Sequence, residues 1–268
     1  MRIPVLVLAG RRAGGDLMAD ASGLRHRALL PIAGVPMLER VVSSLEASGV
    51  VSGVTVTADD PVLLEATEAL ASWSSGPGPF LRAHPCADSP ASSVAAFLGA
   101  PSAQVPLLVT TADHPLLTPE MVRWFVEAAL QSPADLVVGM VPASVYRRRF
   151  PDQPRTFIPL RGEKYSGANL FLLRTPEARG VASFWTRAEA YRKTPWKLVR
   201  VFGLSNLALF LAGQLDLAAA LRRASRVIGA QVAAVELPFA EAALDVDKEA
   251  DRVAVEAVFA ERARGAAA

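Results

Sequence analysis

The sequence contains a single cysteine, little net charge and no long apolar run, and each of these absences excludes a class of protein. Cys86 is the only cysteine among 268 residues. An internal disulfide and a cysteine-rich zinc site are therefore excluded, and a cytoplasmic location is expected. The formal net charge of +2 is too small to predict nucleic-acid binding, so no nucleic-acid partner is expected.

No segment has the roughly 18 consecutive apolar residues that a membrane helix needs. The nearest, residues 204–221, is interrupted by polar side chains, and we interpret it as an amphipathic helix. The apolar run that starts at Val5 is closed by Gly10, which is too short for a secretory leader. We therefore expect neither a membrane span nor a signal peptide.

Apolar residues make up 51% of the chain, enough for a sizeable core. Short apolar runs alternate with helical patterns, which predicts an α/β, Rossmann-like, mostly parallel sheet with helices on both faces. The predicted strands are 4–8, 53–57, 79–83, 105–110, 135–141, 168–173 and 231–236. The predicted helices are 37–48, 61–72, 91–99, 119–131 and 248–264.

We find no clear linker and interpret residues 1–268 as one domain with an elaborated second half. Residues 142–167 are rich in proline and arginine and are interpreted as an insertion. Residues 176–225 are predicted to be mostly helical, basic at first and then amphipathic. Together, residues 142–225 form the elaborated part of the second half.

The loop after the first predicted strand has the composition of a phosphate-binding loop. Glycine lets a backbone approach phosphate closely, and cations offset the phosphate charge. The loop and its flank supply both in Gly10, Gly14, Gly15, Arg11, Arg12, Arg25 and Arg27. Neither the P-loop pattern nor the dinucleotide fingerprint is present. The alternative is an ordinary surface loop with solvated arginines.

A second apolar run, Val105–Val109, leads to Asp113. In open α/β sheets, ligands bind at the carboxyl ends of the strands, and Mg2+ prefers one or two carboxylates together with substrate phosphates. Asp113 is therefore well placed to hold a metal ion against the first loop. The alternative is that Asp113 caps the next helix, but Thr118 lies closer to its start.

Asp245 and Asp247 form an Asp-x-Asp pair late in the chain. Alternate residues of an extended segment face the same side, so both carboxylates are able to point at one cation. Asp-x-Asp also occurs in metal-dependent glycosyltransferases of related fold. The alternative is structural: Asp247 would cap the last helix, and Asp251 would be a charge of its first turn.

Three motifs in order resemble the MobA-like nucleotidyltransferases. They are Leu8-Ala9-Gly10 with Ala28–Leu38, then Thr111–Leu117, then Leu244–Asp251, and together they span nearly the whole chain. The resemblance implies nucleotide binding by Leu8, Ala9, Gly10 and Arg11, and metal binding by Asp113 and a late acidic residue. The sequence departs from the family pattern at two positions, where Arg11 replaces a glycine and Arg27 replaces a lysine.

The resemblance also implies that Ser93, near the start of a helix, contacts the nucleotide. It further implies that residues 142–225 lie on the acceptor side of a cleft, with Lys164, Gly167 and Asn169 as acceptor-binding residues. The structural alternatives are a plain serine cap for the helix and a solvated face for the arginines of the insertion.

These observations predict transfer of a nucleoside monophosphate from an NTP to a phosphorylated small molecule, with Mg2+ as cofactor and pyrophosphate as product. Arg27 and Asp113 are the predicted catalytic residues, and Asp113, Asp245 and Asp247 are the predicted metal ligands. Two alternatives stay open: an Asp-x-Asp glycosyltransferase, and a non-catalytic nucleotide-binding protein in which Arg11 and Arg27 replace the catalytic pattern. The sequence leaves the base, the acceptor (phosphosugar, phospho-alcohol or molybdopterin) and the oligomeric state open.

Overall fold

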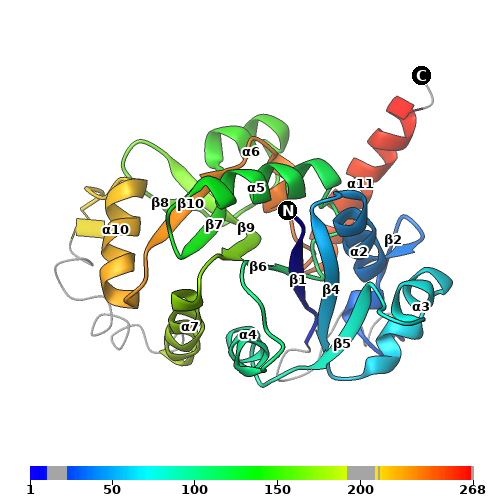
Figure 1. The fold of residues 1–268 in the computed structure, drawn as a ribbon. Coiled ribbons are helices and arrows are strands. Elements are labelled where there is room, and N and C mark those ends of the chain that lie inside the picture. The colour runs from blue at the N-terminus through cyan, green and yellow to red at the C-terminus, as the bar shows by residue number, and fades with distance from the viewer. Residues whose placement is uncertain (11–22, 192–208, 211, 267–268) are drawn as a thin grey trace.

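The computed structural model describes residues 1–10, 23–191, 209–210 and 212–266. They form an eight-stranded sheet in the order β10-β7-β9-β6-β1-β4-β5, with β8 paired to β9 (Figure 1). Strand β9 runs antiparallel to β6, β7 and β8, and the other pairs are parallel. The predicted α/β fold with a mostly parallel sheet is confirmed.

The strands lie close to their predicted positions. They are β1 (Ile3–Leu8), β4 (Val51–Ala58), β5 (Leu81–Pro85), β6 (Leu107–Thr111), β7 (Leu136–Pro142), β8 (Ile158–Pro159), β9 (Lys164–Leu173) and β10 (Val232–Glu236). A separate hairpin pairs β2 (Pro31–Ile32) with β3 (Val35–Pro36). The hairpin was not predicted, because its strands are only two residues long.

The α-helices are α2 (Met37–Ala47), α3 (Glu68–Ser74), α4 (Pro90–Gly99), α5 (Pro119–Gln131), α6 (Ala143–Arg149), α7 (Arg179–Tyr191), α10 (Leu217–Ile228) and α11 (Glu249–Ala266). The 3-10 turns are η1 (Arg27–Leu29), η2 (Pro61–Glu65), η3 (Pro176–Ala178) and η4 (Ala240–Ala243). The single helix predicted for 61–72 is wrong: Thr67 is extended and caps α3 by accepting from the Leu70 amide, so η2 and α3 are separate. Among the described residues, no helix combines the length and apolarity that crossing a membrane requires.

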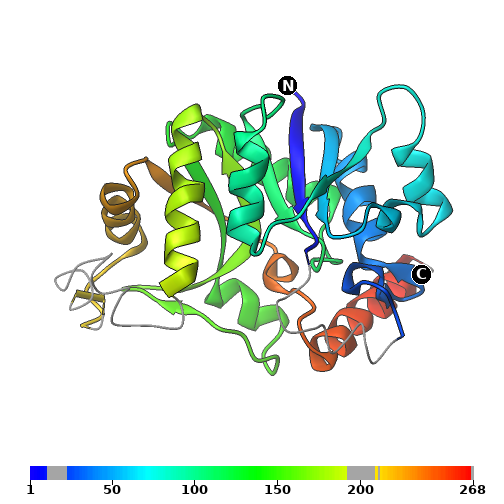
Figure 2. The ribbon, with the colours of Figure 1, turned by 90° about the horizontal axis from the view of Figure 1, so that it is seen from below.

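Helices cover both faces of the sheet because the side chains of β1 alternate between them. Val5 and Val7 belong to the core formed with α2 and α5, whereas Leu6 and Leu8 belong to the core formed with α4 and α7. Figures 1 and 2 show α4 and α7 side by side over one face. Full burial of each such side chain contributes about 1.5–3 kcal/mol to the free energy of folding. The two cores hold β1 at the centre of the sheet.

The segment predicted as an insertion, 142–167, contains regular structure. It holds α6, β8 and the start of β9, which therefore begins at Lys164 rather than at residue 168. The register of β9 against β7 shifts between Val138 and Met140, and within this irregularity Asn169 has a positive φ of 51°. A bulge of this kind redirects a side chain at the edge of a sheet. Of the helical region predicted for 176–225, the structure describes η3, α7 and α10, and residues 192–208 lie outside the described part.

Three loops meet at one edge of the sheet. The ends of β1 and β6 are in register at Leu8 and Thr111, and the Ala112 amide donates to the Leu8 carbonyl at 3.0 Å. The Val246 amide donates to the Asp113 carbonyl at 2.9 Å, which attaches the segment before α11 to the same edge. Residues far apart in the sequence are thereby placed together.

Candidate active site

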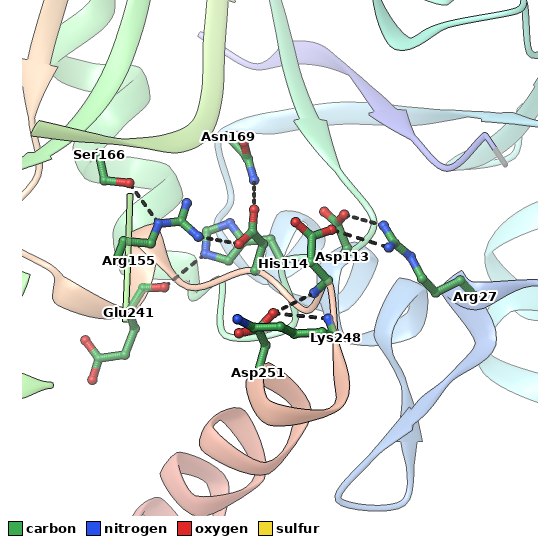
Figure 3. Close-up of polar contacts among 11 residues, drawn as sticks. Arg27, Asp113, His114, Arg155, Ser166, Asn169, Glu241, Lys248 and Asp251 are labelled. Atoms are coloured by element: carbon green, nitrogen blue, oxygen red, sulfur yellow. Dashed lines mark hydrogen bonds and ion pairs between the residues drawn. The ribbon is translucent and has the colours of Figure 1, made fainter. Parts of the chain in front are cut away.

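Arg27 joins two carboxylates at this edge. The 3-10 turn that carries it is capped by His26, whose Nδ1 accepts from the Ala28 amide at 3.1 Å. The Arg27 Nη2 atom lies 2.7 Å from Asp113 Oδ2, and Nη1 lies 3.4 Å from Asp247 Oδ1 (Figure 3). The side chains of Arg27 and Asp113 are 16% and 18% exposed, so solvent screens this pair less than a surface pair.

The two carboxylate oxygens of Asp113 have different surroundings. Its Oδ1 atom is buried and has no hydrogen-bond partner in the described part of the chain. Burial raises the pKa of Asp113, and the nearby Asp245 and Asp247 raise it further, although the Thr111 side chain and the Arg27 charge lower it. Asp113 is not the cap of α5, because Thr118 accepts from the Met121 amide and fills that position. Asp113 is therefore available to a ligand rather than required by a helix.

A small pocket of about 30 Å3 lies between the two loops. Leu8, Ala9, Gly10, Arg27 and Asp113 are among the residues that line it, so the predicted nucleotide-binding motif and the predicted catalytic pair share one cavity. Arg11, the other residue predicted to bind nucleotide here, lies outside the described residues.

Asp245 faces a different arginine. Its Oδ1 atom forms an ion pair with Arg155, and its Oδ2 atom accepts from Asn169 Nδ2 at 3.1 Å. Although burial acts to raise the pKa of Asp245, the Arg155 charge and the hydrogen bonds from Arg155 and Asn169 hold it below its usual value. The two carboxylates of the Asp-x-Asp pair thus contact different cations instead of converging on one.

Asp251 has the structural role expected of a first-turn residue. It is 8% exposed, and its Oδ2 atom accepts from the backbone amides of Asp247 and Lys248 at 3.1 Å each. These contacts fix the turn that leads into α11 and hence the position of Asp247. Asp251 therefore supports the site by holding the backbone of Asp247 and Lys248.

His114, next to Asp113 in the chain, contacts a backbone carbonyl. It is buried, and its Nε2 atom lies 3.3 Å from the Glu241 carbonyl, to which it donates. Burial lowers the pKa of His114 to about 4, so the ring is neutral near pH 7. His114 therefore adds no positive charge to this edge near pH 7.

Asp113 and Asp247 are the two predicted metal ligands that face the same side chain. No group of three or more His, Cys, Asp or Glu side chains in the described ranges is arranged to hold a metal ion. Asp113 and Asp247 nevertheless converge on one cation, Arg27, and Asp113 Oδ1 has no other partner. Two carboxylate ligands completed by phosphate oxygens match what Mg2+ requires.

The remaining predicted residues lie in two places. Ser93 is buried on α4, and its hydroxyl accepts from the Ala87 amide at 2.9 Å, while Ser89 caps that helix. Lys164 is exposed at the start of β9. A Cβ atom added to Gly167 would meet no other atom within 4 Å, so this position has open space beside it.

Two features of the site were not predicted from the sequence. Arg155 was not distinguished from the other cations of its segment, because its contacts with Asp245 and Ser166 come from distant parts of the chain. Cys86 lies beside Gly10: a Cβ atom built on that glycine would be 3.5 Å from the cysteine Cβ. No sequence motif marks either residue.

With this geometry established, comparison with known proteins gives one family. A model described as the MobA-like NTP transferase domain matches residues 5–191. No curated protein matches the chain. A solved structure titled as a hypothetical transferase from Thermus thermophilus is 31% identical, with a TM-score of 0.78, and the match covers 94% of this chain and 100% of that one.

Two more distant structures share the fold. A CMP:2-keto-3-deoxy-manno-octonic acid synthetase complexed with CTP has 16% identity and a TM-score of 0.59, over 98% of this chain and 100% of that one. A 4-diphosphocytidyl-2C-methyl-D-erythritol synthase from Anaerococcus prevotii has 9% identity and a TM-score of 0.54, over 96% of this chain and 98% of that one.

Proposed function

The chain belongs to the MobA-like NTP transferase family, and from this premise we propose that it transfers a nucleoside monophosphate from an NTP to a phosphorylated small molecule. In the proposed reaction a phosphate oxygen of the acceptor attacks the α-phosphorus of the NTP. The bond between the α-phosphorus and the bridging oxygen breaks, and pyrophosphate leaves. Nucleotidyl transfer is the activity class of the family; the acceptor and the products are our proposal.

Binding of the triphosphate is assigned to the loop after β1. Leu8, Ala9 and Gly10 line the pocket beside Arg27, and a glycine at its rim lets the backbone approach phosphate oxygens. Arg11 and Ser93 are further proposed contacts from the family resemblance. Little covalent chemistry is required of the protein, because positioning and charge stabilisation dominate such reactions.

Arg27 is proposed to stabilise the charge that develops on the phosphates. Its guanidinium already spans two carboxylates, and its planar fork suits phosphate oxygens equally well. Arginine keeps the positive charge of the family's lysine, so the departure at this position is compatible with catalysis. An arriving triphosphate would compete with Asp113 and Asp247 for the same N–H donors.

Asp113 and Asp247 are the proposed carboxylate ligands of Mg2+. When bound, the ion would neutralise phosphate charge and polarise the α-phosphate. The chain's own contribution is the arrangement of the two ligands: the Val246 amide fixes the late segment to the Asp113 carbonyl, and Asp251 fixes the Asp247 backbone. Asp245 was predicted as a third ligand, and its two carboxylate oxygens contact Arg155 and Asn169.

The acceptor is proposed to lie on the β9 side of the site. Lys164 supplies an exposed positive charge there, Gly167 leaves open space, and Asn169 reaches Asp245 from the bulge. A cation and an amide near an open strand are suited to a phosphorylated molecule with further polar groups.

The observation that carries the proposal is the meeting of Gly10, Arg27 and Asp113 in one pocket. The test is a screen of the four NTPs against phosphorylated sugars, phosphorylated alcohols and molybdopterin, with pyrophosphate release as the readout. Asp113→Asn should abolish release, whereas Asp152→Asn, the same change at an exposed position, should not. A glycosyltransferase would release no pyrophosphate from an NTP, and a binding protein would retain the NTP unchanged; either result would reject the proposal.

A further inference from the structure

Arg155 links Asp245 to strand β9. Its Nε atom donates to Ser166 Oγ at 2.8 Å, and its Nη1 atom forms the ion pair with Asp245 Oδ1. Ser166 is 3% exposed on β9, so this anchor is rigid. The side chains of Arg155 and Asp245 are 19% and 17% exposed. Because Asn169 donates to the other oxygen, both carboxylate oxygens of Asp245 are occupied.

The neighbouring carboxylates are arranged differently. Asp113 and Asp247 share Arg27, the Asp247 side chain is 43% exposed, and Asp113 Oδ1 has no partner within the described residues. In Figure 3, Arg27 and Arg155 lie on opposite sides of Asp113. One arginine is shared by two carboxylates at the nucleotide pocket, while the other is anchored to the sheet and serves one carboxylate.

Electrostatic repulsion explains why Asp245 has an arginine of its own. Three carboxylates close together repel one another strongly at neutral pH, and an arginine beside one of them relieves the repulsion. Removing a partner from a half-buried ion pair leaves an uncompensated charge, so the Arg155–Asp245 pair resists disruption. A metal ion that reached Asp245 would have to displace both Arg155 and Asn169.

Resting on the proposed function, we propose that Arg155 is a positioning residue that keeps Asp245 out of the metal site, so that Asp113 and Asp247 alone supply its carboxylates. Asp245 then serves to hold Arg155 and Asn169 on the acceptor side. The connection between α6 and β9 thereby sets how many carboxylates the metal ion meets.

The test is a titration of the full chain with Mn2+. The electron paramagnetic resonance signal of the free ion measures how much Mn2+ remains unbound at each step. The decisive variant is the double substitution Arg155→Gln with Asp245→Asn, which preserves net charge and the capacity for a hydrogen bond. Its Mn2+ affinity should stay within about threefold of wild type, because the charge near the ion is unchanged. If Asp245 were a ligand, the double variant would lose roughly 10–100-fold in affinity, the scale of disturbed metal sites.

The single variant Arg155→Gln should have the opposite effect. It removes a positive charge and one of the two side-chain contacts of Asp245 described above, so Mn2+ affinity should rise at least about fivefold. Arg148→Gln is the matched control, because Arg148 is exposed on α6; it should change the affinity by less than about twofold, since solvent screens exposed charges. Circular dichroism establishes that each variant is folded.

The outcomes separate this inference from the proposed function. Mn2+ binding that is lost in Asp113→Asn supports the metal site of the proposed function, and its absence from wild type with each of the four NTPs would overturn both ideas. Binding that depends on Asp113 but is also lost in the double variant would overturn only the role of Arg155. An Mn2+ affinity in Arg155→Gln equal to that in Arg148→Gln would likewise overturn only the role of Arg155.

Discussion

The Nη2 atom of Arg27 lies 2.7 Å from Oδ2 of Asp113, so an ion pair joins the loop after β1 to the loop after β6. The pair brings the predicted phosphate-binding cation and the predicted metal ligand into direct contact. The same arginine also contacts Asp247, so it lies between the two carboxylates that we propose as metal ligands. Under the proposed function, we expect an arriving phosphate to compete with Asp113 for the Arg27 guanidinium.

Replacing Arg27 by alanine should slow the reaction. The change removes a charge-assisted contact with the phosphates and should raise the activation free energy by about 1.5–3 kcal/mol, the scale of a hydrogen bond to a charged group. Arg27→Lys keeps the charge that the family pattern uses and should retain activity or even raise it. Steady-state pyrophosphate release measures both, and unaltered turnover in Arg27→Ala would show that the residue is only structural.

The buried Asp113 carboxylate predicts a pH-dependent difference in stability. Because burial raises its pKa, the folded chain holds a proton here more tightly than the unfolded chain. The stabilising contribution is therefore fully present below the ordinary Asp value of 3.8 and is lost as the pH rises through the raised pKa. Asp113→Asn stays neutral, so without metal it should melt at a higher temperature than wild type near pH 7.

Differential scanning calorimetry from pH 4 to pH 8 would test this expectation. The advantage of Asp113→Asn should shrink toward acidic pH, and Asp152→Asn should show no such trend because its carboxylate is exposed. Equal melting temperatures at every pH would mean that Arg27 fully offsets the burial of Asp113.

The sequence predicted those parts of the fold that depend on local periodicity. The apolar runs located each long strand, and the rule that ligands bind at the carboxyl ends of strands correctly placed Gly10, Arg27 and Asp113 at one edge. The bulge at Asn169 and the pairing of Arg155 with Asp245 were not predictable, because both depend on contacts between distant segments. Alternation placed Asp245 and Asp247 on one side, but two differently anchored arginines separate their carboxylates.

Gly139 is expected to be required for the packing of the β7–β9 bulge. A Cβ atom at this position would lie 3.0 Å from Leu237 Cδ1 and 3.2 Å from Leu170 Cβ, inside a packed core. Gly139→Ala should therefore lower the free energy of unfolding by about 1–3 kcal/mol, as overpacking does. Gly99→Ala is the control, because a Cβ atom there meets nothing within 4 Å. Urea denaturation measures both, and equal stability would contradict the packing argument.

Gly10 should be required for nucleotide binding rather than for folding. A Cβ atom would lie 3.5 Å from Cys86 Cβ, an ordinary contact distance, so Gly10→Ala and Gly10→Val should both fold. The branched side chain of valine would occupy the rim of the pocket and prevent the close approach of the phosphates. Calorimetric titration with the four NTPs should show loss of binding in Gly10→Val and an intermediate effect in Gly10→Ala. Wild-type affinity in both variants would remove this loop from the site.

Cys86 provides a reporter of nucleotide binding that needs no acceptor. It is the only cysteine, it lies beside Gly10, and its thiol donates to Asp59. Burial and the hydrogen bond to Asp59 raise its pKa to about 11, so little thiolate exists at pH 8 and alkylation by iodoacetamide should be slow. Asp59→Asn removes the nearby negative charge and should accelerate the alkylation, whereas a bound NTP should slow it by covering the Gly10 side of the pocket.

Mass spectrometry of the labelled chain measures both effects on the alkylation rate of Cys86. A labelling rate that does not respond to any NTP would place the nucleotide away from Gly10. A rate unaffected by Asp59→Asn would show that Asp59 does not control the reactivity of the thiol.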